Sequence, residues 1–153
     1  MLSIVRCPCS HPDFVALIGE LDAGLRAMYG SLQDILDLQN RVSDLSTGVV
    51  AYADGMPAGC GCIREYNSDA VEIKRMFVKP EKRRQGISSR ILTELEKWAV
   101  ELGYTQALIE TGAGQTEAIA LYTKSGYRRT ANFGPFADMG DSVCLAKDLK
   151  KRL

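Results

Sequence analysis

The stretch KPEKRRQGISSRIL, residues 79–92, holds the residue types whose spacing is most suited to chemistry. Lysines and arginines precede Gly86, and Ser88 and Ser89 follow it at the start of an apolar run. The first turn of a helix carries free backbone N–H groups and a partial positive charge, so it attracts anions. Gly86 lets a ligand approach the backbone, and the hydroxyl and guanidinium groups add hydrogen-bond donors. The arrangement predicts a site for a pyrophosphate.

Two other interpretations of this basic stretch stay open at this point. It could be a solvated turn in which Gly86 is an ordinary loop residue, or it could contact nucleic acid. The stretch contains neither the G-x-x-x-x-G-K-[ST] loop nor the G-x-G-x-x-G fingerprint. Nucleic-acid binding is disfavoured because the formal net charge of the chain is zero and no aromatic residue interleaves the cations.

Hydrophobic spacing predicts the elements that must position this stretch. Strands are expected over residues 3–7, 46–66 (two strands joined by a turn at Asp54-Gly55), 69–80, 105–111, 127–131 and 141–149. Helices are expected over residues 13–29, 32–40, 86–102 and 115–126. The basic stretch then lies where a strand ends and a long helix begins. A length of 153 residues, with no repeat and no linker, predicts a single mixed-sheet α/β domain over residues 1–153, its central strands flanked by helices.

The strand expected before the basic stretch is irregular. Apolar residues alternate with Glu72 and Lys74, but the polar residues Lys74 and Arg75 are then adjacent, and an unbroken apolar run follows them. A β-bulge would produce this change of phase, because one extra residue turns the later side chains to the other face. A strand buried on both faces near its end is the alternative.

Residues 71–104, VEIKRMFVKPEKRRQGISSRILTELEKWAVELGY, resemble the acetyl-CoA-binding core of the GNAT-type N-acetyltransferase superfamily. The family signature [RQ]-x-x-G-x-[GA] is matched at Arg83, Gly86 and Ser88, although the family prefers Gly or Ala where this chain has Ser88. Residues 110–129 resemble the family's next segment, A-x-x-L-Y-x-x-x-G-[FY]. Its matches are Ala118, Leu121, Tyr122, Gly126 and Tyr127. The similarity runs over residues 48–147, and residues 1–47 correspond to the variable substrate-side strand and helices.

The resemblance implies a GNAT acyl-CoA N-acyltransferase fold with acetyl-CoA as co-substrate. The backbone of Met76, Phe77 and Val78 would hold the pantetheine arm, as an extended ligand pairs with a strand. The pyrophosphate would lie at the helix N-terminus. The residues assigned to it are Arg83, Arg84, Gln85, Gly86, Ile87, Ser88 and Ser89, and Gln115 is assigned to the cofactor as well.

Three residues are candidates for catalysis by the same resemblance. Making a lysine-like amine neutral at pH 7 costs about 4–5 kcal/mol, so a base or a desolvating pocket is expected. Glu72 occupies the family's frequent position for the general base. Glu110, at the end of the neighbouring strand, is the other candidate for this role. The non-catalytic alternative for Glu72 is an exposed carboxylate on a strand. Tyr122 is the family's usual acid towards the leaving sulfur, and a core tyrosine is the alternative.

The implied function is transfer of an acetyl group from acetyl-CoA to a primary amine of a small molecule or protein. A non-catalytic module that senses acyl-CoA is the alternative function. By the resemblance, residues 1–47 build the acceptor side, and their acidic bias suits a cationic acceptor; a solvated helix face is the alternative explanation. No nucleic-acid partner is expected, because the net charge is zero and no aromatic residue interleaves the cations. No membrane partner is expected either, because no apolar run approaches the ~20 residues of a membrane span. A homodimer is one assembly that the sequence permits.

The cysteines and the N-terminus bear on compartment and metals. Five cysteines, an odd number, argue against a disulfide framework. The pairs Cys7/Cys9 and Cys60/Cys62 are spaced C-x-C, closer than the usual zinc spacing, so no metal is expected, and Cys60 and Cys62 suit a buried strand face. The N-terminus lacks the layout of a signal peptide, and a cytoplasmic location is expected. His11 precedes Pro12 near a helix start, where a capping or a surface role is expected rather than catalysis.

Overall fold

The computed structural model describes residues 1–30, 42–137 and 140–150, and it divides into two compact units. The first unit comprises Met1–Arg64 and Lys74–Leu95, and the second comprises Glu65–Ile73 and Glu96–Leu153. The strands are β1 (Leu2–Cys7), β2 (Gly48–Ala53), β3 (Met56–Glu65), β4 (Ala70–Val78), β5 (Gln106–Gly112), β6 (Arg128–Thr130) and β7 (Ser142–Asp148). The helices are α1 (Pro12–Tyr29), α3 (Ile87–Glu101) and α4 (Thr116–Lys124), with short 3-10 turns η1 (Pro80–Lys82) and η2 (Gly134–Phe136).

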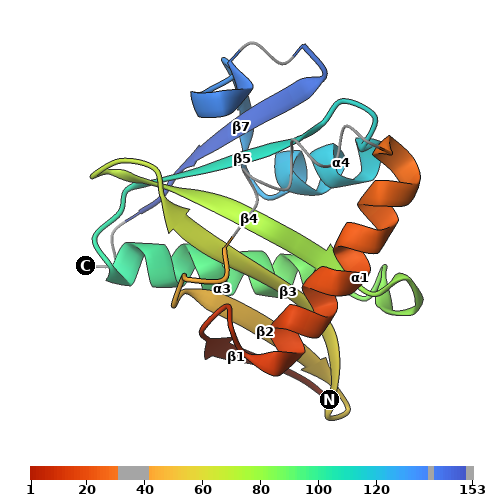
Figure 1. Ribbon diagram of the computed structural model, residues 1–153. Coiled ribbons are helices and arrows are strands. Elements are labelled where there is room, and N and C mark those ends of the chain that lie inside the picture. Colours follow the sequence, from red (N-terminus) through yellow and green to blue (C-terminus); the bar gives the residue numbers. More distant parts are fainter. Residues whose placement is uncertain (31–41, 138–139, 151–153) are drawn as a thin grey trace. The chain divides into compact units, whose positions relative to one another are not determined.

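The described strands form one mixed sheet, which confirms the predicted fold class (Figure 1). Their hydrogen-bonded order is β1-β2-β3-β4-β5-β7-β6, and β4 contributes its residues to both units. Pairing is antiparallel in β1–β2, β2–β3, β5–β7 and β6–β7 and parallel in β4–β5. None of the described helices combines the length and the apolar character needed to cross a bilayer. The expectation of one domain over residues 1–153 stays a prediction.

In the first unit, the turns and caps predicted from local sequence are confirmed. Asp54 (φ +51°) and Gly55 (φ +83°) join β2 to β3, and two consecutive positive φ values are the backbone of a tight hairpin turn. His11 caps α1, since its Nδ1 accepts a hydrogen bond from the Asp13 N–H at 3.1 Å. Gly30 ends the helix, where its N–H bonds to the Arg26 carbonyl. The helix predicted over residues 32–40 lies outside the described residues.

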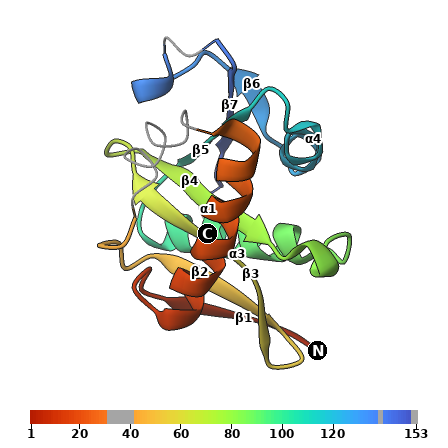
Figure 2. The ribbon, with the colours of Figure 1, turned by 45° about the vertical axis from the view of Figure 1, so that its right-hand side comes forward.

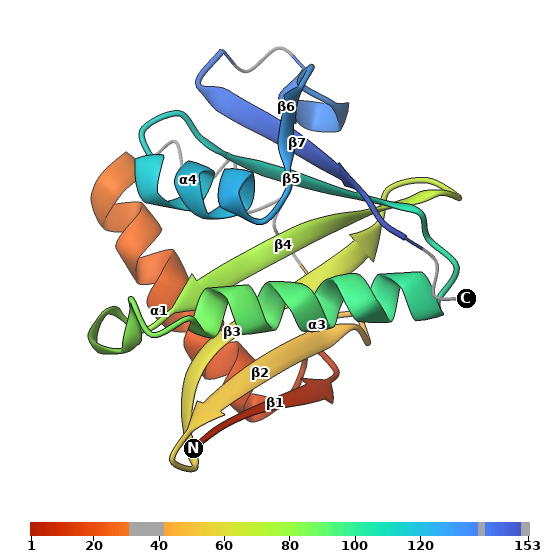
Figure 3. The same ribbon diagram turned by 180° about the vertical axis from the view of Figure 1, so that it is seen from behind.

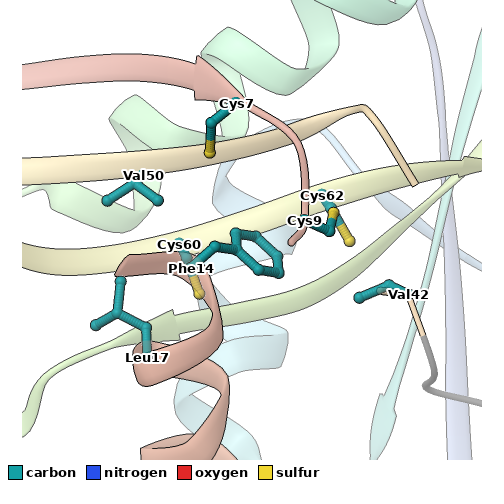
Figure 4. Close-up of a cluster of buried hydrophobic side chains, with 8 residues drawn as sticks. All are labelled: Cys7, Cys9, Phe14, Leu17, Val42, Val50, Cys60 and Cys62. Carbon is teal, nitrogen blue, oxygen red and sulfur yellow. The ribbon is translucent and has the colours of Figure 1, made fainter. Parts of the chain in front are cut away.

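Two helices cover opposite faces of the strands in the first unit. On one face, Phe14 and Leu17 of α1 pack in a buried cluster with strand residues, as Figure 4 shows. The remaining members of that cluster are Cys7, Cys9, Val42, Val50, Cys60 and Cys62. On the other face, Gly59 and Gly61 admit the side chains of α3, which runs in front of β2 and β3 in Figure 3. Neighbouring strand residues point to opposite faces, so Cys60 and Gly61 necessarily face different helices.

In the second unit, the start of β4 pairs with β5, and β7 and β6 follow (Figure 2). The parallel register runs from Ala70 opposite Gln106 to Ile73 opposite Ile109. Helix α4 is followed by Gly126 at φ +98°, which permits the sharp end that the sequence predicts. The predicted strands over residues 105–111, 127–131 and 141–149 are confirmed within one or two residues.

Strand β4 contains the predicted irregularity. Arg75 adopts φ +59°, a left-handed conformation that is unusual for a residue with a side chain. It lies at the position where the apolar–polar alternation changes phase. Ala70 to Arg75 are also buried without interruption, so this strand is both locally distorted and covered on both faces.

Candidate functional site

The chain between β4 and α3 forms a compact loop with an exposed backbone. After η1, Arg84 (φ +64°) and Gly86 (φ +77°) are both left-handed, and α3 begins at Ile87. Ile87 is buried, whereas Arg84, Gln85 and Gly86 are exposed. The loop therefore buries its apolar residue and leaves the three residues before it exposed. The first N–H groups of α3 have no partner within the helix, as at any helix start.

Space beside Gly86 is open. A Cβ built on this residue would meet no atom within 4 Å. An anion can therefore approach the backbone at the start of α3 closely, and glycine is the residue that combines this approach with a positive φ. The predicted pyrophosphate residues Arg83 to Ser89 all lie in this loop and in the first turn of α3, within the first unit. Their assignment to the phosphates of acetyl-CoA stays a prediction.

Arg83 ties the loop to the strand before it. Its Nε donates a hydrogen bond to the Val78 carbonyl at 3.0 Å. The terminal nitrogens of the guanidinium project from an exposed side chain, where they can reach an anion. Arg83 therefore has two roles: it fixes the end of β4, and it supplies positive charge beside the loop.

The predicted pantetheine residues, Met76 to Val78, lie at the end of β4 against β3. A Cβ built on Gly59 would lie 2.8 Å from the Phe77 carbonyl oxygen, and one built on Gly61 would lie 2.6 Å from the Met76 sulfur. The Lys79 N–H bonds to the Ala58 carbonyl at 2.9 Å. The glycines of GCGC thus permit an approach between the two strands that no larger residue would allow.

Residues that the sequence analysis did not connect with one another hold the distorted part of β4. Arg75 is buried and pairs through Nη2 with Asp22 of α1 at 2.5 Å. Behind it, the thiols of Cys62 and Cys60 donate to the Lys74 and Arg75 carbonyls at 3.5 and 3.6 Å. The adjacent polar residues Lys74 and Arg75 were the only signal of this arrangement in the sequence, because it depends on partners far away in the chain.

In the second unit, Tyr122 of α4 is a buried phenol. Its side chain is 6% exposed and packs edge-to-face against Tyr127, with ring centroids 6.1 Å apart. Burial raises the pKa of Tyr122 to about 12. The hydroxyl therefore keeps its proton at physiological pH and can act as a hydrogen-bond donor.

An ionic network fixes the ring on which Tyr122 packs. The Tyr127 hydroxyl donates to Glu96 at 2.8 Å, and the Lys147 ammonium donates to the other oxygen of the same carboxylate at 2.8 Å. The Lys147 nitrogen also lies 5.6 Å from the centre of the Tyr127 ring. Burial is the main cause that raises the pKa of Tyr127 above its usual range. Tyr127 is therefore held in a single position against Tyr122.

The two candidate bases share one face of the sheet in the second unit. Glu72 lies opposite Leu108, and Glu110, two residues further along β5, lies opposite Cys144 of β7. Alternation of side chains places these residues on the same face. Glu72 is only 5% exposed. Burial, and to a lesser degree the charges of Glu110 and Glu72, raise the pKa of the Cys144 thiol, which agrees with both carboxylates lying near it.

The structure thus places the predicted residues in two groups. The residues predicted to bind the donor lie in the first unit, except Gln115. Tyr122, Glu72 and Glu110 lie in the second unit, where Gln115 immediately precedes α4 and makes no capping hydrogen bond through its side chain. The described residues contain no group of three or more His, Cys, Asp or Glu residues that could hold a metal ion.

Sequence comparisons identify relatives of the chain. The model of the acetyltransferase (GNAT) family matches residues 17–127. An IAA acetyltransferase from Azospirillum brasilense is 36% identical over 137 residues, which cover 88% of this chain and 90% of that protein.

Solved structures share the fold. A protein from Klebsiella pneumoniae, assigned as an acyl-CoA N-acyltransferase, is 32% identical, covers 98% of this chain and 99% of its own, and superposes with a TM-score of 0.81. A GNAT family acetyltransferase from Elizabethkingia anophelis, solved with acetyl-CoA bound, has a TM-score of 0.70 at 22% identity. It covers 97% of this chain and 98% of its own.

Proposed function

The chain belongs to the GNAT family of acetyltransferases and uses acetyl-CoA as acetyl donor, and from this premise we propose which residues carry the reaction and which acceptor they serve. The acceptor is a primary amine. The observation that carries the proposal is the left-handed loop before α3, whose exposed backbone and open space at Gly86 suit a pyrophosphate.

The donor is held by backbone groups of the first unit. Amides from Arg84 to Ser89 bind the pyrophosphate at the start of α3, and Arg83 adds charge to the same anion. Ser88, which replaces the usual small residue, is half-buried and small enough to leave this path open. The proposal is supported by the hydrogen bond from Arg83 to Val78, which joins the phosphate loop to the strand that precedes it.

The position proposed for the pantetheine arm follows from the register of β4. Pairing between β4 and β5 runs from Ala70 to Ile73, and Met76 to Val78 come after that paired segment. An extended, amide-bearing arm can pair with such a strand as an added strand would. The close packing of Gly59 and Gly61 against the same residues keeps this part of β4 rigid, which lowers the entropy lost when the donor binds.

A carboxylate of the second unit accepts the proton of the incoming ammonium. Neutralising a lysine-like amine at pH 7 costs about 4–5 kcal/mol, which a nearby carboxylate and a desolvated site can offset. Glu72 is the first candidate because it is the more buried of the two, and Glu110 on the same face is the second. Two carboxylates on one face also favour a cationic acceptor, since they attract its ammonium group before transfer.

Tyr122 stabilises the departing sulfur by a hydrogen bond. With its pKa raised to about 12, the phenol is a much weaker acid than a thiol of pKa ~8.5, and complete proton transfer would be uphill by about 5 kcal/mol. A hydrogen bond that strengthens as negative charge grows on sulfur stabilises the transition state without that cost. Tyr127 supports this role because it fixes the ring position of Tyr122.

Release of free CoA from acetyl-CoA, measured against a panel of primary amines, tests the function. The panel should contain polyamines, amino acids, aromatic amines and lysine peptides, each at several pH values. We expect turnover with at least one cationic amine and a rate that rises with pH as the amine loses its proton. No thiol release with any amine, in protein shown to bind acetyl-CoA, would contradict the proposed reaction.

Substitution separates the two candidate bases. Glu72→Gln is expected to lower kcat at neutral pH by about 100-fold and to leave the affinity for acetyl-CoA within about twofold. Glu110→Gln serves as the matched variant on the same sheet face. A larger loss in Glu110→Gln than in Glu72→Gln would move the role of the base to Glu110.

A further inference from the structure

Two cysteines that are remote in sequence meet in the core of the first unit. Cys9 and Cys62 belong to the same buried cluster, and their thiols interact there. Both are buried, with 2% and 0% exposure, and Figure 4 shows their sulfurs adjacent. Neither thiol has a part in the proposed transfer reaction.

Gly48 explains why these two cysteines reach each other across a strand. In the sheet, Cys7 lies opposite Gly48, and Gly48 lies opposite Cys62, so β2 separates β1 from β3. Two strand spacings amount to roughly 9–10 Å, which is too far for a disulfide between Cys7 and Cys62. Beyond the end of β1, the Cys9 sulfur passes over Gly48, where an added Cβ would lie 3.2 Å from it. The missing side chain leaves the space in which Cys9 contacts Cys62.

The same Cys62 thiol is a structural hydrogen-bond donor. It donates to the Lys74 carbonyl at 3.5 Å, next to Arg75 with its left-handed backbone. Cys60 donates to the Arg75 carbonyl at 3.6 Å. The two thiols therefore satisfy consecutive carbonyl groups at the distortion of β4, directly before Met76–Val78. A disulfide at Cys62 would remove one of these donors.

We propose that Cys9 and Cys62 are a site of reversible disulfide formation, and that the bond weakens binding of the acetyl donor through β4. A peroxide is the oxidant: two thiols and one hydrogen peroxide give one disulfide and two waters. Two electrons leave the sulfurs, the S–H bonds break, the S–S bond forms, and the O–O bond of the peroxide is cleaved. A dithiol reverses the reaction by exchange.

The electrostatics of the pair favour Cys9 as the attacking sulfur. The Cys62 side chain beside it lowers the pKa of the Cys9 thiol. The interaction with Cys9, together with burial, raises the pKa of the Cys62 thiol. A thiolate reacts with peroxide to a sulfenic acid, and a neighbouring thiol condenses with it to release water. Cys9 is therefore the sulfur oxidised first, and Cys62 is the resolving thiol.

The effect on the donor rests on the proposed function, because it assumes that acetyl-CoA lies along Met76–Val78. Loss of the Cys62 donor leaves the Lys74 carbonyl without that hydrogen bond and relaxes the left-handed backbone at Arg75. The expected decrease in acetyl-CoA affinity is about fivefold, the size that loss of one hydrogen bond produces.

The test uses the folded full-length chain, reduced and then treated with hydrogen peroxide. Peptide mapping by mass spectrometry under non-reducing conditions identifies the linked cysteines. Calorimetry with acetyl-CoA measures the affinity before oxidation, after oxidation, and after dithiothreitol. We expect a Cys9–Cys62 linkage, a Kd about fivefold higher in the linked protein, and recovery after reduction.

Two variants with similar loss of volume act as a matched pair. Cys9→Ala removes the oxidised sulfur but keeps Cys62 and its bond to Lys74, so it should bind acetyl-CoA as the reduced protein does and be insensitive to peroxide. Cys7→Ala, in the same buried cluster and two residues away, should keep its sensitivity. Thermal unfolding of both variants checks that the fold is retained.

The result that would overturn the proposal is a different linkage, no linkage, or an unchanged affinity in the linked protein. Peroxide sensitivity that persists in Cys9→Ala would overturn it as well. Failure of the proposed function has a separate signature: the reduced protein would then not bind acetyl-CoA at all, while peptide mapping would still report whether Cys9 and Cys62 are joined.

Discussion

The Nε of Arg83 donates a hydrogen bond to the carbonyl of Val78 at 3.0 Å, and this bond closes the loop between β4 and α3 onto the strand that it leaves. One residue of the predicted phosphate site is thereby attached to one residue of the predicted pantetheine strand. Because of this hydrogen bond, the predicted phosphate loop and the predicted pantetheine strand are held together in the first unit.

Replacing Arg83 by lysine tests this bond with the charge conserved. Lysine cannot reproduce the directional Nε–H donor, so the loop loses its attachment to Val78. We expect a Kd for acetyl-CoA that is about tenfold higher, the loss expected for one hydrogen bond from a charged group, with little change in kcat. Calorimetry and steady-state kinetics measure the two quantities. Arg129→Lys, at an exposed position in the second unit, is the control and should change neither.

Replacing Gly86 by alanine tests whether the open space beside it belongs to the ligand. No protein atom would contact the added methyl, so the substitution costs only the left-handed strain of about 1–2 kcal/mol in unfolding free energy. Gly103→Ala is matched to it, since Gly103 also has a positive φ (+98°), open surroundings, and a place at the other end of α3. Both variants should be destabilised alike in denaturant titrations, and only Gly86→Ala should lose acetyl-CoA affinity. Equal affinities in the two variants would remove Gly86 from the site.

Replacing Tyr122 by phenylalanine removes the proposed donor to sulfur and keeps the ring. We expect kcat to fall by about 100-fold, as for loss of one donor to a developing charge, and the Kd for acetyl-CoA to change by less than twofold. Tyr104→Phe, which removes a hydroxyl bonded to Glu65 in the same unit, is the control and should leave kcat unchanged. Unchanged turnover in Tyr122→Phe would exclude a role in chemistry.

Stability at alkaline pH should depend on Tyr122. The pKa is near 10 in the unfolded chain and about 12 in the folded protein, because burial disfavours the phenolate. Above pH 10 the unfolded state loses the proton while the folded state keeps it, so the unfolding free energy falls as pH rises and the contribution is lost by about pH 12. The fall amounts to as much as ~3 kcal/mol for this residue. Urea titrations between pH 9 and 11.5 should show a shallower fall in Tyr122→Phe, and identical slopes would contradict the assignment.

The sequence by itself determined the elements and the positions of their ends. Hydrophobic periodicity defined α1, α3 and the strands, and Pro12, Gly30, Gly103 and the Asp54-Gly55 turn marked where they begin or stop. These signals act between residues a few positions apart, so they can be recognised without knowing the fold. The same is true of the glycine and cations before α3, since a helix start binds anions wherever it occurs. The family motifs added the cofactor and the reaction.

Only the tertiary structure decided which distant residues meet. Arg75 pairs with Asp22, 53 positions away, because α1 packs against the sheet. Cys9 contacts Cys62 because of the register of β1, β2 and β3. The change of phase at Lys74 and Arg75 indicated a distortion of β4, but not the thiols of Cys60 and Cys62 that bond to it. Such contacts are fixed by the way non-adjacent segments fill a common core, a free-energy balance over the whole chain that no local pattern encodes.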